Sequence, residues 1–286
     1  MMKPTLLSAL ATLAVASSFP VHALDCQRAS LPVEKLICAT PELQKADEAM
    51  SAAYFKLLRK TTDSDFHEAL IRSQRRWADL RSRGVDRFGA AADVNRTDDR
   101  DVLLEMTRDR LRRLQAVEPI GTIEQQRKLA AQDGGGPFAG YESHCFFEPP
   151  PYGSWGYICL GTAYRQHNER ICSVAKEWAS GRFNEYRLVS VVKNGKPKPV
   201  ASCSLGFDEA RGRCPDDDVK TKTTAHWNTN PRPSDYLHNL PHASGLWKYD
   251  VDFDMDTVDQ PWMRECLLAP TFPPPDVSRP SSSRGK

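Results

Sequence analysis

Four carboxylates occupy alternate positions near the C-terminal end of the sequence. They are Asp250, Asp252, Asp254 and Asp256, and apolar residues fill the positions between them. Side chains of a strand alternate between its two faces, so the spacing predicts a strand over 245–258 with one apolar face and one acidic face. A row of carboxylates attracts cationic proteins, which makes these four aspartates the candidate partner-binding residues. The same pattern is also typical of a strand with a solvated face.

A calcium loop is the sharper alternative for this segment, because Asp-x-Asp-x-Asp resembles the start of an EF-hand loop. No glycine follows at the sixth position, and the twelfth position is Pro261 or Met263 instead of glutamate. We therefore expect no metal at this segment.

Motifs for catalysis are missing from the sequence. There is no Gly-x-Ser-x-Gly, phosphate-binding loop or dinucleotide fingerprint. His238 and His242 have the spacing of a zinc protease, but Asn239 stands where the glutamate is needed and Pro241 breaks any helix. We predict no catalytic residue and no cofactor, and hence a binding protein rather than an enzyme.

Cysteine usage indicates an oxidising compartment. An even number of cysteines reads as a set of disulfides in an exported protein. No Cys-x-x-C pair is present, which disfavours zinc. The eight cysteines are Cys26, Cys38, Cys145, Cys159, Cys172, Cys203, Cys214 and Cys266. The pairing of the last six stays open.

The N-terminus has the layout of a secretory signal peptide. Lys3 precedes an apolar run from Leu6 to Ala16, and Val21 and Ala23 occupy the −3 and −1 positions of an A-x-A-like cleavage site. The run is too short to span a membrane. The sequence predicts a signal peptide over 1–23, cleaved after Ala23, and a periplasmic or secreted protein with no stable membrane insertion.

Composition and length indicate which class of partner and how many domains to expect. The chain has 286 residues, 40% of them hydrophobic and 27% charged, which excludes global disorder. Lys and Arg number 39 against 37 Asp and Glu, so no charge excess indicates nucleic acid. The length favours two domains.

Residues 24–117 read as helical. A short helix is expected over Pro32–Cys38, and longer amphipathic helices are expected after Thr40, from Asp65 to a stop at Gly84, and after Thr97. Together they predict a small antiparallel bundle. The basic run from Arg72 to Arg87 is expected to be a solvated face, and Trp77 to be core.

The spacing of apolar residues changes from helical to alternating after a segment rich in glycine and proline. Residues 118–139 are expected to form a linker. Strands are predicted over 157–164, 171–178, 186–192 and 199–205, with a hairpin turn at Asn194-Gly195. The fold class is α+β, with the helical bundle followed by a disulfide-stapled, mainly antiparallel β domain over 140–270. Residues 271–286 are expected to be a disordered tail rich in proline and serine.

Several motifs of the helical region carry a family resemblance. They are Asp25-Cys26, Pro32–Cys38, Pro41-Glu42-Leu43, Ser73–Trp77 and Met106–Arg110. Their order and spacing resemble the N-terminal domain of the lysozyme inhibitor LprI family over about a third of the chain. The resemblance implies a protein partner, a lysozyme, which would be inhibited by blocking access to its cleft.

One departure from the family pattern concerns cysteines. Val85 and Val102 stand where the family has two cysteines, so the resemblance implies loss of one disulfide and a small apolar contact in its place. Cys26 and Cys38 remain, and the resemblance implies that they pair with each other.

Two other functions are compatible with the sequence. A cell-wall carbohydrate-binding or hydrolase accessory protein would use exposed aromatics, for which the candidates are Trp155, Trp178, Trp227 and Trp247. An immunity protein against a secreted toxin is the second. The sequence says nothing of the oligomeric state.

Overall fold

The computed structural model describes residues 24–91, 99–148, 156–179, 182–205, 212–215, 226–233, 240–241 and 245–273. Within these ranges, the side chains of 84–91, 99, 148, 156, 178–179, 182–183 and 257 are not described. The predicted signal peptide, its cleavage site and the tail beyond residue 273 lie outside the described residues, as does the expected contact of Val85.

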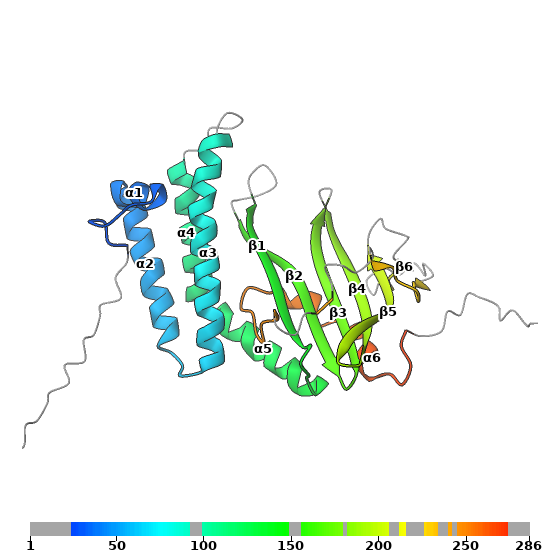
Figure 1. The fold of residues 1–286 in the computed structure, drawn as a ribbon. Helices are drawn as coiled ribbons and strands as arrows, with labels where there is room; N and C mark the ends of the chain where they lie inside the picture. Colours follow the sequence, from blue (N-terminus) through cyan, green and yellow to red (C-terminus); the bar gives the residue numbers. More distant parts are fainter. Residues whose placement is uncertain are drawn as a thin grey trace, which may run out of the picture.

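The first part of the chain is helical, as predicted. It comprises α1 (Pro32–Ala39), α2 (Pro41–Leu58), α3 (Ser64–Ala91) and α4 (Asp99–Gln115). The long helices α2, α3 and α4 lie side by side (Figure 1). The predicted stop at Gly84 is wrong, because α3 continues to Ala91. A glycine inside a helix costs only about 1 kcal/mol, which packing along the rest of the helix offsets.

The segment expected to be a linker is mostly a helix, α5 (Glu118–Asp133). Glu118 and Pro119 occupy its first turn, where an acid and a proline are favourable. Gly134, with φ of 85°, ends it in the left-handed conformation. The glycines and proline after Gln132 therefore end a helix. Ile123 of α5 is buried in the cluster shared by the helical part and the sheet, and Leu129 is buried in the main core of the sheet.

A seven-stranded sheet follows, mainly antiparallel as predicted. Its strands are β1 (Gly140–Glu148), β2 (Gly156–His167), β3 (Arg170–Ala179), β4 (Arg182–Lys193), β5 (Lys196–Leu205), β6 (Gly212–Arg213) and β7 (His226–Trp227). Neighbours in the sheet are neighbours in the sequence, and β5–β6 is the one parallel pair among them. Asn194 and Gly195 join β4 to β5 with positive φ at both residues, as the hairpin prediction requires.

The predicted strand over 245–258 is wrong. The described part of this segment is irregular apart from an antiparallel bridge between Trp247 and Tyr141 and the 3-10 turn η3 (Met255–Thr257). Asp250 and Asp254 each accept a hydrogen bond from the backbone N–H two residues on, at 3.0 and 3.1 Å. These local bonds offer the backbone an alternative to a strand ladder.

One face of the sheet is covered by this irregular segment and by helix α6 (Pro261–Leu268). The expected burial of the apolar face is confirmed for Val251, Phe253 and Met255 but is wrong for Trp247, which is 41% exposed. The main core consists of Tyr141, Ala163, Val174, Val189 and Ala201 from the sheet and of Phe253, Met255, Val258, Trp262 and Met263 from the covering segment.

A second cluster joins the helical part to the sheet. Trp77, fully buried as expected, lies in the same cluster as Leu70 of α3, Tyr157 of β2 and Val251. The two regions therefore share apolar packing and are not separated by solvent.

All eight cysteines form disulfides, which staple both regions. The pairs are Cys26–Cys38, Cys145–Cys159, Cys172–Cys266 and Cys203–Cys214. The pairing of Cys26 with Cys38 confirms the expectation and ties the N-terminal segment to α1. No helix of the described residues is both long and apolar enough to cross a membrane.

Candidate functional site

The predicted acidic row is divided between the interior and the surface. The side chain of Asp250 is 1% exposed and that of Asp252 is 4% exposed, so a partner protein cannot reach them. Asp254 is 40% exposed, and Asp256 is exposed. The four carboxylates thus do not form one solvent-facing row, because the segment is not a strand.

Asp250 and Asp252 instead bind arginines of the helical part. Arg76 of α3 makes a bidentate contact with Asp250, at 2.8 and 3.1 Å, and reaches Asp252 Oδ2 at 2.5 Å. Arg110 of α4, 2% exposed, lies 3.5 Å from Asp252 Oδ1. The basic run was expected to be a solvated face, and that expectation is wrong for Arg72, Arg76 and Arg81, whose side chains are 16%, 17% and 13% exposed.

Neutral groups complete this buried network. Ser73 and Tyr157 donate hydrogen bonds to Asp252 at 2.8 and 3.0 Å. Gln126 of α5 donates to the carbonyl of Asp250 at 2.8 Å and accepts from its N–H at 3.0 Å. The network therefore fastens α3, α4, α5 and β2 to one irregular segment.

The surroundings of the network favour an ionised Asp252 and a neutral Tyr157. Burial alone would raise the pKa of Asp252, but the guanidinium groups of Arg110 and Arg76 and two hydrogen bonds hold it below its ordinary value. Burial, with the charge of Asp252 beside it, raises the pKa of Tyr157. Each carboxylate is neutralised by a partner, so this network is a structural junction and does not offer a general base.

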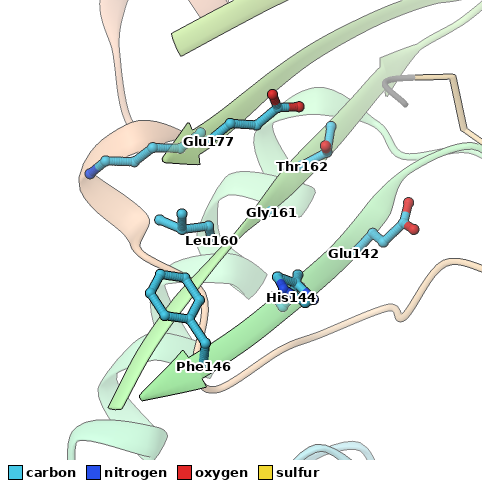
Figure 2. Close-up of a pocket in the computed structure, with 9 residues that line it drawn as sticks. Glu142, His144, Phe146, Leu160, Gly161, Thr162 and Glu177 are labelled. Carbon is cyan, nitrogen blue, oxygen red and sulfur yellow. The ribbon is translucent and has the colours of Figure 1, made fainter. Parts of the chain in front are cut away.

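An open hollow of about 570 Å³ lies on the sheet where β1, β2 and β3 meet (Figure 2). Figure 2 shows Glu142, His144 and Phe146 along β1, beside Leu160 and Thr162 of β2. Strand alternation explains this arrangement, since Glu142 is opposite Thr162 and His144 is opposite Leu160 in the register. Glu177 of β3 closes the far side.

The hollow presents carboxylates without assembling a metal site. Glu142 and His144 are exposed and Glu177 is half-buried. Among the described residues, the one group of three possible ligands close enough for a metal is Cys145, Cys159 and Asp252. Both of its sulfurs are used in a disulfide. The described residues of the hollow therefore include no group of three possible metal ligands.

The tryptophans suggested for carbohydrate binding differ in their packing and exposure. Trp227 packs against Trp262 and Phe272, with ring centroids 6.3 and 5.2 Å away. Trp247 is 41% exposed. The side chains of Trp155 and Trp178 lie outside the described residues.

The sequence of the helical part matches the model of a known protein family. The family model of the lysozyme inhibitor LprI matches residues 26–114. This match confirms the resemblance and covers about a third of the chain, from the first disulfide to the end of α4. No curated protein and no solved structure matches the chain.

The buried network joins the LprI-like domain to the C-terminal region. Arg76 and Arg110 lie inside the matched residues, whereas both aspartates lie in the unassigned C-terminal region. No local pattern in the sequence marked this junction, because Asp254 also lies between two buried apolar residues and yet is 40% exposed. The family match and four disulfides together indicate an extracytoplasmic protein.

Proposed function

We propose that this protein is an exported inhibitor that binds a lysozyme and blocks access to its sugar cleft. The observation that carries the proposal is the LprI family match over residues 26–114. The integrity of that domain supports it, since its disulfide is formed and its tryptophan is buried. Under this proposal the protein acts by binding and has no catalytic step or cofactor.

The contact surface we propose is acidic. Many lysozymes are cationic, and opposite charges across an interface speed association. Of the four aspartates, Asp254 and Asp256 remain accessible. Glu142 and Glu177 line the hollow on the opposite face of the sheet, where they form a second acidic candidate surface. Lys176, which also lines the hollow, pairs with Asp254 at 2.6 Å.

The test is a lysis assay with a c-type lysozyme acting on cell walls, combined with a direct binding measurement. The expected result is a slower decrease in turbidity in proportion to added protein, together with a complex of defined stoichiometry. Unchanged lysis with no complex would refute the proposal. Retention by insoluble peptidoglycan without any effect on lysozyme would favour the cell-wall accessory function instead.

A further inference from the structure

A second open groove, of about 800 Å³, lies between α3 and the segment that starts at Trp247. Its α3 side includes Ser64, Glu68, Ile71 and Arg75. The groove exists because Trp247, from the unassigned region, lies against a helix of the LprI-like domain. It is separate from the sheet hollow, with which it shares no lining residue.

Trp247 is exposed and yet held in place. The guanidinium carbon of Arg72 lies 3.8 Å from the centre of the indole ring, and the same guanidinium donates a hydrogen bond to the carbonyl of Tyr249. The backbone of Trp247 makes two hydrogen bonds with Tyr141, at 2.8 and 3.0 Å. A ring fixed in this way loses little conformational entropy when a ligand stacks on it.

The surroundings of the ring are polar. The other exposed large hydrophobic residues of the described chain are Leu31, Val117 and Leu268, and none of them lines the groove. A protein interface would need a larger apolar centre around its tryptophan. The ligand that fits is therefore polar, with one apolar face of the size of a ring.

The groove also contains an uncompensated positive charge. Arg75 is exposed, and its guanidinium makes no hydrogen bond or ion pair with any described residue. The neighbouring Arg76 is neutralised by Asp250 and Asp252. Asp79 pairs with Arg83. An anionic group on the ligand would find Arg75 available.

We propose that this groove binds an acidic sugar, with a pyranose ring stacked on Trp247 and its carboxylate paired with Arg75. Ser64 and Glu68 line the same groove and supply hydrogen-bonding groups for sugar hydroxyls. The volume suits a ligand of one or two sugar rings. This site does not depend on the proposed inhibition of lysozyme.

Two disaccharides of equal length test the proposal by calorimetry on the whole protein. One is N-acetylglucosaminyl-N-acetylmuramic acid, which has a carboxylate, and the other is diacetylchitobiose, which has none. We expect the acidic disaccharide to bind about two- to fivefold more tightly, as an exposed ion pair allows. Trp247→Ala should weaken both about tenfold, and Arg75→Gln should remove the difference between them.

Arg112→Gln is the matched control, since Arg112 is an exposed arginine of α4 that does not line the groove. It should leave both affinities unchanged. Equal affinity of the wild type for the two disaccharides, or no effect of Trp247→Ala on either, overturns the proposal. Binding of triglutamate that is as tight and as sensitive to Trp247→Ala also overturns it, in favour of an acidic peptide. Arg75→Gln changes an exposed side chain, so its result does not depend on how well Trp247→Ala folds.

Discussion

Asp252 is the residue at which the buried contacts of this protein converge. Its carboxylate accepts hydrogen bonds from Ser73, Tyr157 and Arg76 and lies beside Arg110. A buried ion pair is not itself strong evidence of stability, because desolvation opposes the attraction. Removing one partner is different, since it leaves the other charge buried and unpaired.

Asp252→Asn should therefore destabilise the protein by about 3–5 kcal/mol, because Arg76 and Arg110 lose a counter-charge. The measurement is the free energy of unfolding in urea. Asp256→Asn is the control, an exposed aspartate of the same segment, and should change stability by less than about 0.5 kcal/mol. Equal effects of the two variants would contradict the assignment of Asp252 to a buried junction.

The pH dependence of the same residue has a defined sign. The pKa of Asp252 in the folded protein is below its ordinary value of 3.8. Its contribution to stability is therefore complete above that value and is lost as the pH falls through the folded pKa. Stability measured through this acid range should fall less steeply for Asp252→Asn than for the wild type, and parallel curves would refute the prediction.

Element α5 is fastened to the start of α3 by a second ion pair. Arg127 Nη1 lies 2.5 Å from Asp63 Oδ2, and Asp63 also accepts the N–H of Phe66 at 3.1 Å. The side-chain hydrogen bond from Arg127 lowers the pKa of Asp63 to about 2. Arg127→Gln should raise this pKa toward 3.8, which an NMR titration of the Asp63 carboxyl can follow. An unchanged titration would mean that the helix cap alone sets the pKa.

Helix α6 is tied to β3 by Cys172–Cys266, which are 94 residues apart in the sequence. Loop entropy predicts a loss of about 4–5 kcal/mol when both cysteines become alanine. Removing Cys203–Cys214, with a separation of 11, should cost about 3 kcal/mol. Urea unfolding of the two double variants tests the order, and the reverse order would show that α6 is held mainly by packing.

At the scale of the whole molecule, the helical part and the sheet depend on each other. Arg76 and Arg110 come from one part and their aspartates from the other, with α5 between them. We expect one cooperative thermal transition in calorimetry, with equal calorimetric and van't Hoff enthalpies. Residues 24–117 alone should lack a fixed tertiary structure by near-UV circular dichroism. Two separate transitions in the intact protein would instead support independent domains.

The proposed lysozyme contact is tested on the intact molecule by charge removal. Glu142→Gln with Glu177→Gln should slow association with a cationic lysozyme severalfold at low salt and flatten the salt dependence, while dissociation changes little. Glu169→Gln, an exposed glutamate in the turn between β2 and β3, is the control. A double variant that associates at the wild-type rate would move the interface elsewhere, to the LprI-like domain first.

Local patterns in the sequence were sufficient for much of the fold. Helical spacing predicted α1 to α4, alternation and the Asn194-Gly195 pair predicted four of the strands, and the family motifs predicted the Cys26–Cys38 bridge. These features depend on residues close together in the chain or on a motif of known spacing. Strand β1 and helices α5 and α6 were not predicted.

The tertiary structure alone decided the role of the acidic segment. The alternation of apolar and acidic residues predicted which side chains between 250 and 256 are buried. It cannot distinguish a strand from an irregular segment that packs against one face of a sheet. The carboxylates of Asp250 and Asp252 find arginines more than 140 residues away in the sequence, and Asp-backbone bonds replace the ladder. Partners at such separations leave no local periodicity, so burial and pairing of these charges become apparent only when the chain is folded.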